Sequence, residues 1–153
     1  MLGISACLGG VACRYDGGSN EIAALKKLVE TGCAVMICPE VLGGLPTPRI
    51  PAEIQGGDGF DVWLGKAKVM DREGNDLTEE FKQGAIKAFE ELRKQQINAL
   101  VLKERSPSCG SGLIYDGSFS GTRVKGTGVA TAYFIQQGLA VYSEENWQEM
   151  RMT

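Results

Sequence analysis

Three short apolar runs, each followed by a cysteine, alternate with helical patterns in this chain. The runs and their cysteines are residues 3–6 with Cys7, residues 34–37 with Cys38, and residues 99–102 with Cys109, which lies in the loop beyond. Runs of this length that alternate with helices predict parallel strands of an α/β sheet. The carboxyl ends of such strands border one crevice, in which these folds bind ligands. We therefore expect the cysteines to converge there as a thiophilic metal centre with one unfilled coordination position.

Helical patterns fill the segments between the predicted strands. One helix is expected to begin at Ser19 or Asn20, which both favour the N-cap, and to stop at Gly32, which suits the position after a helix. Another begins at Thr78, where two glutamates follow at the positive end of the helix dipole. The remaining elements are a helix over residues 128–137, a strand over residues 139–142, and a helix over residues 144–152 with Trp147 and Met150 facing inward.

Two segments depart from this alternation. Residues 60–64 and 68–70 predict a small β-hairpin around a turn at residues 65–66. Residues 106–128 are rich in Gly and Ser and lack a helical period, which predicts an ordered functional loop. The expected fold is a single domain over residues 1–153 of the α/β class. Its core is a Rossmann-like, mostly parallel open sheet of about four strands flanked by helices, with the β-hairpin as an insertion.

The amino-acid composition excludes several kinds of catalytic and binding site. The chain has 153 residues, a net charge of -3, five cysteines and no histidine. The missing histidine excludes a Ser-His or Cys-His nucleophile pair and a His-ligated zinc site. The net negative charge does not favour nucleic-acid binding, and no apolar run is long enough to span a membrane. Without a signal peptide at the N-terminus, a cytoplasmic location is expected, where cysteines are more often catalytic or metal-bound than paired.

The cysteine spacing favours iron and sulfur over zinc. A zinc site closed by protein ligands takes four, commonly in paired Cys-x-x-Cys knuckles, and the sequence has no such pair. Iron–sulfur clusters are held by thiolates, normally four for a four-iron cluster. Three cysteine ligands would leave one iron with the open position that Lewis-acid chemistry needs.

The other two cysteines are interpreted differently. Cys13 lies in a Gly-rich loop beside Arg14, which favours a thiolate. It is a fourth ligand, a redox partner of Cys7, or a loop thiol. Cys33 begins the second strand at the opposite end of the sheet, and we expect it to be a core residue.

Two polar residues near the cysteines are candidates for catalysis. Glu40 lies two residues beyond Cys38, so it is either a surface carboxylate or a general acid or base beside the metal. Ser106 lies three residues before Cys109, so it is either a catalytic residue at the same site or a hydroxyl that caps a turn.

The basic residues of the loops are dispersed, and most are expected to be solvated, with some at the crevice mouth to receive an anion. They are Arg14, Arg49, Lys103, Arg105, Arg123 and Lys125. Residues 126–128 precede a predicted helix and form a weak signal for anion binding at its N-terminus.

These motifs together resemble the bacterial thiouracil desulfidase family, long known as a domain of unknown function. The first motif is Ser5-Ala6-Cys7-Leu8-Gly9 with Cys13-Arg14-Tyr15-Asp16-Gly17, and the second is Cys38-Pro39-Glu40 through Gly43-Gly44-Leu45-Pro46-Thr47-Pro48-Arg49. The third comprises Leu102-Lys103, Ser106-Pro107-Ser108-Cys109-Gly110, Ile114-Tyr115-Asp116-Gly117, Phe119-Ser120-Gly121 and Gly128-Val129. They cover nearly the whole chain in the expected order, and we expect no counterpart of the C-terminal domain of larger members.

The resemblance implies a [4Fe-4S] cluster held by only three cysteines, matching Cys7, Cys38 and Cys109. It also implies non-redox hydrolysis of the C–S bond of a thiolated pyrimidine. On this resemblance, the substrate sulfur would bind the unligated iron, water would attack the ring carbon, and uracil and hydrogen sulfide would leave. Glu40 matches the glutamate that assists proton transfer, and Ser106 matches the serine beside the substrate. The expected partner is a small-molecule thiolated nucleobase or nucleotide.

Two other functions compete with desulfuration. The open crevice would also serve a metal or cluster carrier without catalysis. A thiol–disulfide enzyme would use Cys7 and Cys13, although the chain has no Cys-x-x-Cys motif.

Overall fold

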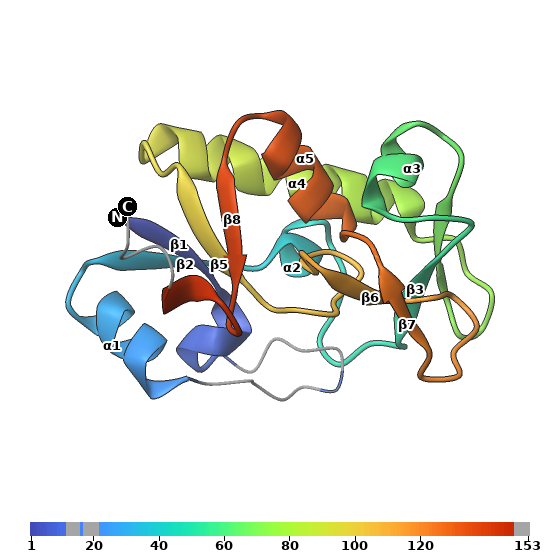
Figure 1. Ribbon diagram of the computed structural model, residues 1–153, viewed down its shortest axis with the longest axis horizontal. Coiled ribbons are helices and arrows are strands. Elements are labelled where there is room, and N and C mark those ends of the chain that lie inside the picture. Colours follow the sequence, from blue (N-terminus) through green and yellow to red (C-terminus); the bar gives the residue numbers. More distant parts are fainter. Residues whose placement is uncertain (12–15, 17–21, 149–153) are drawn as a thin grey trace.

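A four-stranded parallel sheet forms the centre of the computed structural model, which describes residues 1–11, 16 and 22–148. Its strands lie side by side in the order β2, β1, β5, β8 (Figure 1). Their bounds are Leu2–Ser5 for β1, Ala34–Ile37 for β2, Ala99–Leu102 for β5 and Ala140–Ser143 for β8. The predicted α/β class and parallel sheet are confirmed, with every predicted strand of this sheet within one residue of its expected position.

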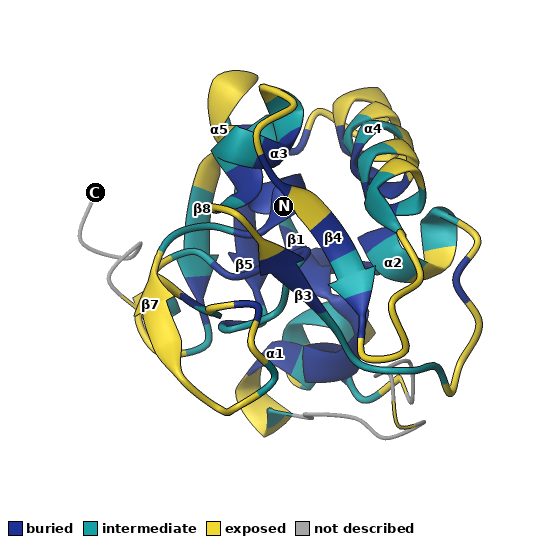
Figure 2. Cartoon of the chain, turned by 90° about the vertical axis from the view of Figure 1, so that its right-hand side faces the viewer, coloured by how far each residue is buried: buried dark blue, intermediate teal, exposed yellow. Residues whose placement is uncertain are grey.

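Helices cover both faces of this sheet because its strands are apolar on both sides. On one face, α1 (Ala23–Glu30) packs Leu25 into a cluster with Ile4 and Val101. On the other face, α4 (Thr78–Lys94) and α5 (Val129–Gln136) pack against Leu100 (Figure 1). In Figure 2 the central strands β1 and β5 have the colour of buried residues and lie between the helices of the two faces. No helix in the described part of the chain is long and apolar enough to cross a membrane.

The strand order reverses between β1 and β5. From β1 the chain crosses to β2 on one side, and it later returns to add β5 on the other side. In open α/β sheets the crevice outside the carboxyl ends of two such strands is the usual ligand site. Two short helices begin at this edge, η1 (Ala6–Gly9) after β1 and α2 (Pro39–Leu42) after β2.

The insertion between β2 and β5 contains a β-hairpin, as predicted, and the strand predicted at residues 68–70 is confirmed, but its partner strand is not the predicted one. The antiparallel pair is β3 (Ala52–Gln55) with β4 (Lys68–Asp71). Residues 60–64 were predicted as a strand, but residues 60–63 belong to helix α3 (Gly59–Trp63) and Leu64 is its C-cap. The prediction was wrong because Asp58 and Asp61 form a reciprocal capping box that starts a helix there.

The segment 106–128 is ordered, as expected, and contains a second hairpin that was not predicted. It consists of β6 (Leu113–Tyr115) and β7 (Arg123–Lys125). Every residue of β7 is exposed (Figure 2), whereas Ile114 of β6 is buried in a cluster with Ile54 and Val62. This cluster joins both hairpins and α3 to Phe81 of α4 and Val129 of α5.

The predictions for the C-terminal helix and for the two ends of the first helix are confirmed only in part. Residues 144–146 form a turn instead of the predicted helix start, and residues 147 and 148 begin a 3-10 helix, where Trp147 packs inward as predicted against the cluster around Ile4. Residues 149–152, with Met150, lie outside the described residues, as do Ser19 and Asn20, but the helix predicted to begin there starts later, at Ala23 with extended Ile22 as its N-cap. Gly32 follows α1 in the left-handed conformation expected of it, with φ +77°.

Helix α2 is held against α4 by a backbone contact at glycine. A methyl group on Gly84 would overlap the carbonyl oxygen of Pro39, and a methyl group on Gly43 would overlap that of Glu80. Because Pro39 follows Cys38, this contact fixes the arm of the chain that carries Cys38 and Glu40.

Replacing Gly84 by alanine should therefore destabilise the protein. At an exposed helix position the change would stabilise it by about 0.5–1 kcal/mol, but here the overlap with Pro39 should cost about 1–3 kcal/mol. Chemical denaturation measures the sign directly, with Lys87→Ala on the exposed side of α4 as the matched control. A Gly84→Ala protein more stable than wild type would contradict the close contact.

Candidate active site

A cavity of about 530 Å³ lies at the carboxyl end of the sheet. Its lining comes from the ends of β1, β2 and β5 on one side and from the two hairpins on the other. The polar and sulfur-bearing lining residues are Ser5, Cys7, Cys38, Glu40, Arg49, Glu53, Arg72, Lys103, Glu104, Arg105, Ser106, Cys109 and Tyr115. The switch point of the sheet therefore coincides with a concave, chemically rich site.

All three cysteines expected to converge line this cavity. Cys7 lies in η1, Cys38 precedes the first residue of α2, and Cys109 lies in the loop between β5 and β6. Cys7 is 8% exposed and Cys109 5%, while Cys38 is half-buried. Three separate strand ends thus bring three sulfur atoms to one enclosed place.

The electrostatics of the cavity disfavour three uncoordinated thiolates. Burial raises the pKa of Cys109, and the negative charges of Glu40, Cys38 and Cys7 raise it further. A metal that binds the sulfurs would remove this penalty, because coordination stabilises the thiolate. In the described part of the chain, however, no three Cys, Asp or Glu side chains are spaced to hold a single metal ion. Three thiol side chains on one cavity are the type of donor that an iron–sulfur cluster uses.

Glu40 forms an ion pair with an arginine at the cavity. Its Oε2 lies 3.3 Å from Nη2 of Arg49, whose side chain is 7% exposed. Burial raises the pKa of Glu40, and the charge and hydrogen bond of Arg49 oppose that rise without cancelling it. Nη1 of Arg49 also donates to the carbonyl oxygen of Pro46, at 2.9 Å. The surface alternative for Glu40 is therefore wrong, and Arg49 is one of the basic residues that lie at the crevice instead of being solvated.

Ser106 organises the turn that carries Cys109. Its Oγ accepts hydrogen bonds from the backbone N–H groups of Ser108 and Cys109, both at 3.1 Å. It therefore has the turn-capping geometry, and it lines the cavity as well. Because Oγ is the acceptor in both bonds, the hydroxyl proton remains to be donated.

The N-terminus of α5 holds the same turn from outside. The backbone N–H groups of Val129 and Ala130 donate to the carbonyl oxygens of Pro107 and Ser108, both at 2.8 Å. Oγ1 of Thr131 donates to the carbonyl oxygen of Cys109, at 2.8 Å. The anion site expected before this helix is therefore wrong, since protein carbonyl groups occupy those donors.

Two buried carboxylates of the site were missed from the sequence. Glu53 lies on β3, and its Oε1 accepts from the backbone N–H groups of Gly117 and Phe119 at 2.9 and 3.2 Å. Glu104 follows β5 in a run of charged residues that reads as a solvated loop. An acidic residue just after the third strand, at the predicted crevice, was the signal available for Glu104.

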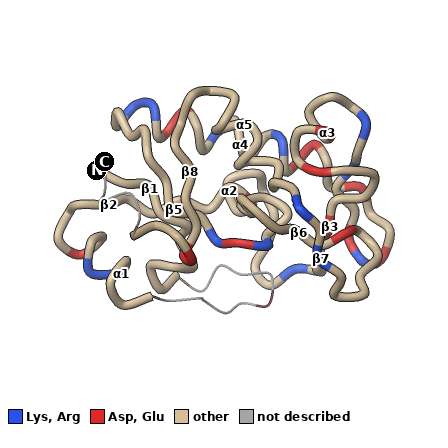
Figure 3. The backbone as a smooth tube through the Cα atoms, viewed as in Figure 1, with Lys and Arg blue, Asp and Glu red and all other residues tan. Residues whose placement is uncertain are grey.

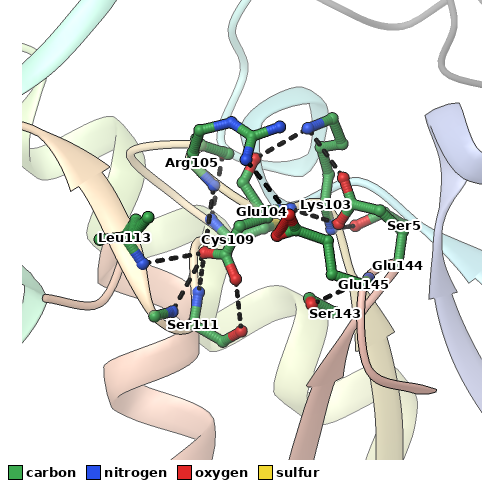
Figure 4. A network of polar contacts seen from close by, with 12 residues as sticks. Ser5, Lys103, Glu104, Arg105, Cys109, Ser111, Leu113, Ser143, Glu144 and Glu145 are labelled. Atoms are coloured by element: carbon green, nitrogen blue, oxygen red, sulfur yellow. Dashed lines mark hydrogen bonds and ion pairs between the residues drawn. The ribbon is translucent and has the colours of Figure 1, made fainter. Parts of the chain in front are cut away.

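Basic and acidic positions are interspersed along the described chain (Figure 3). Beside the cavity they are paired, with Nζ of Lys103 2.9 Å from Oε2 of Glu144 and Nη1 of Arg105 3.6 Å from Oε1 of Glu145 (Figure 4). Lys103 and Arg105 are thus half-buried at the crevice, whereas the residues of β7, including Arg123 and Lys125, are exposed as expected.

The remaining cysteines have separate outcomes. Cys33 is exposed, not a core residue, because it precedes β2 at the end of the sheet away from the cavity. Cys13 and Arg14 lie outside the described residues, so the three interpretations of Cys13 stay predictions.

Comparisons with known proteins agree over nearly the whole chain. A family model described as 2-thiouracil desulfurase matches residues 2–146. The uncharacterized protein YbbK of Bacillus subtilis (strain 168) is 47% identical over 150 residues, which cover 98% of this chain and 99% of that protein. The solved structure of TudS, a [4Fe-4S]-dependent thiouracil desulfidase, matches with a TM-score of 0.88 and 43% identity, covering 99% of this chain and 95% of that one.

Proposed function

Because the chain belongs to the 2-thiouracil desulfurase family, we propose that it is a desulfidase that hydrolyses the C–S bond of thiolated pyrimidines, with an iron–sulfur cluster held by Cys7, Cys38 and Cys109. The observation that carries this proposal is the meeting of three cysteines from three strand ends on one cavity. The cluster dependence of TudS supports it. When bound, a cluster with three protein ligands supplies an iron with an open position, which suits the sulfur of a thiocarbonyl group.

Glu40 is the proposed acid and base. It is the carboxylate that follows a cysteine ligand on α2, and Arg49 fixes one of its oxygens. Hydrolysis replaces the C=S bond by C=O, so the attacking water loses two protons and the departing sulfide gains them. A carboxylate in the cavity can accept a proton from water at one oxygen and return it to sulfur. The chain has no histidine to do this.

Ser106 is the proposed substrate-orienting hydroxyl. Its oxygen is fixed by two backbone N–H donors, so its position does not depend on the substrate. The remaining O–H can donate to an acceptor atom of a pyrimidine ring, such as a carbonyl oxygen.

Aromatic residues from the second hairpin suit a planar base. Tyr115 and Phe119 line the cavity opposite the cysteine arms, and the guanidinium of Arg72 lies 5.8 Å from the centroid of the Phe119 ring. Flat aromatic surfaces favour stacking on a pyrimidine. The bound substrate is then enclosed between this wall and the sulfur-lined end.

Anaerobically reconstituted protein should convert 2- or 4-thiouracil to uracil with release of one sulfide per ring. Loss of the thiocarbonyl absorbance, with sulfide measured in parallel, follows the reaction. Glu40→Gln should keep the cluster and slow turnover by at least about 100-fold, because it removes the proton-transfer group. A protein that carries clusters without catalysis would leave thiouracil unchanged in both forms, and this result would refute the desulfidase.

Iron binding should depend on three cysteines and not on the others. Serine at position 7, 38 or 109 should lower the iron content after reconstitution, because each variant loses one thiolate. Cys33→Ser is the matched control, since Cys33 is exposed away from the cavity. Cys13→Ser should also keep about four irons per chain. Loss of iron in Cys13→Ser would make Cys13 the fourth ligand and leave no open position.

Phe119→Ala should weaken substrate binding more than it slows chemistry. Removing the ring deletes stacking worth about 0.5–1.5 kcal/mol, so KM for thiouracil should rise about 3- to 10-fold with little change in kcat. Phe119→Tyr keeps the flat ring and is the matched control. Equal KM values for Phe119→Ala and wild type would remove Phe119 from the substrate wall.

A further inference from the structure

Glu104 is a buried carboxylate to which the proposed reaction gives no role. It follows the last residue of β5 and is 6% exposed. The two basic residues beside it pair with other partners, Lys103 with Glu144 and Arg105 with Glu145 (Figure 4). A buried carboxylate retained without such an ion pair must be satisfied by other donors.

Backbone N–H groups are those donors. Oε1 of Glu104 accepts from four of them, on Arg105 at 3.2 Å, Ser111 at 2.9 Å, Gly112 at 3.0 Å and Leu113 at 3.1 Å. Oε2 accepts from the hydroxyl of Ser111, at 3.2 Å. Figure 4 shows these bonds gathered around one carboxylate.

These donors flank the turn that carries the candidate ligand. Residues 105 and 111–113 lie on either side of the Ser106–Cys109 segment, so Glu104 ties the two ends of the loop together. Arg105 also has a left-handed backbone, with φ 65°, a strained conformation for a side-chain-bearing residue. Its N–H bond to Glu104 helps to hold that conformation in place.

We propose that Glu104 is a positioning residue, whose carboxylate holds loop 105–113 in the shape that presents Ser106 and Cys109 to the cavity. The inference rests on the proposed function only in treating Cys109 as a ligand. Burial by itself raises the pKa of Glu104, but the N–H bonds from Gly112, Leu113, Arg105 and Ser111 together outweigh it and lower the pKa below its usual value. The acceptor is therefore ionised at neutral pH, when its hydrogen bonds are strongest.

Two substitutions separate the acceptor from the bulk of the side chain. Glu104→Met removes both acceptor oxygens at similar size, whereas Glu104→Gln keeps one oxygen to accept the N–H groups. Asp71→Leu is the matched control, because Asp71 is equally buried, at 6% exposed, and accepts backbone N–H groups from Glu73 and Asn75 in a turn outside the cavity lining.

The first measurement needs no cluster. The reduced full-length chain is labelled with a thiol reagent, and the rate at each cysteine is read by mass spectrometry. In Glu104→Met, Cys109 should be labelled at least about tenfold faster than in wild type, with Cys7 little changed. Glu104→Gln should label within about threefold of wild type. In Asp71→Leu, the buried cysteines should change together or not at all.

The second measurement uses the reconstituted protein. Under chelator challenge, Glu104→Met should lose iron faster than wild type, Glu104→Gln and Asp71→Leu. Labelling of Cys109 in Glu104→Met at the wild-type rate, or in step with Cys7, would overturn the inference, as would Glu104→Gln behaving like Glu104→Met. A wild-type chain that binds no iron would instead refute the proposed function, while the labelling rates still decide the role of Glu104.

Discussion

The pairing of β1 with β2 on one side and β5 on the other is the constraint on which the site depends. Because all three strands run parallel, their carboxyl ends open on the same edge. The chain leaves each strand at that edge through a different device, namely a 3-10 turn after β1, a short helix after β2 and a loop after β5. Each device carries one cysteine, so the sheet sets where the sulfurs can meet.

Local contacts then fix each arm more tightly than the sheet alone can. The arm after β2 is pressed against α4 where Gly84 leaves room for the carbonyl group of Pro39. The turn around Cys109 is pressed against α5 in the same way, since a methyl group on Gly128 would overlap the backbone of Ser108. Buried carboxylates complete the enclosure, with Glu104 bonded to the start of the 104–121 segment and Glu53 to the hairpin tip at its end. Contacts made to the backbone therefore help to hold the segments around the sulfur-lined end.

The sequence predicted those parts of the molecule whose signals are local and repeated. The strand at residues 99–102 and the start of α4 at Thr78 are where apolar period and helix-start chemistry placed them. Residues 60–64 were misread because their apolar content resembles a strand, whereas the deciding signal, the capping box of Asp58 and Asp61, is short and polar. The prediction for Cys33 was wrong because exposure just before an edge strand leaves no mark on residue type.

The site was predictable in its sulfur atoms but not in the groups around them. That each cysteine follows a strand can be predicted from a single sequence, because the strands themselves can be. The burial of Arg49 depends on a partner, Glu40, reached through the folded turn between them. The role of Glu104 depends on four backbone N–H groups, and backbone donors are the same for every residue type. Such contacts exist only once the loop is folded.

The most direct test of the central claim is an anaerobic crystal structure of the reconstituted protein with the iron atoms located by anomalous scattering. We expect one four-iron cluster in the cavity, with Cys7, Cys38 and Cys109 each on a separate iron and no protein ligand on the fourth. A sulfur atom of Cys13 on the fourth iron, or iron bound anywhere else on the chain, would contradict the convergence of these three strand ends on an open catalytic metal.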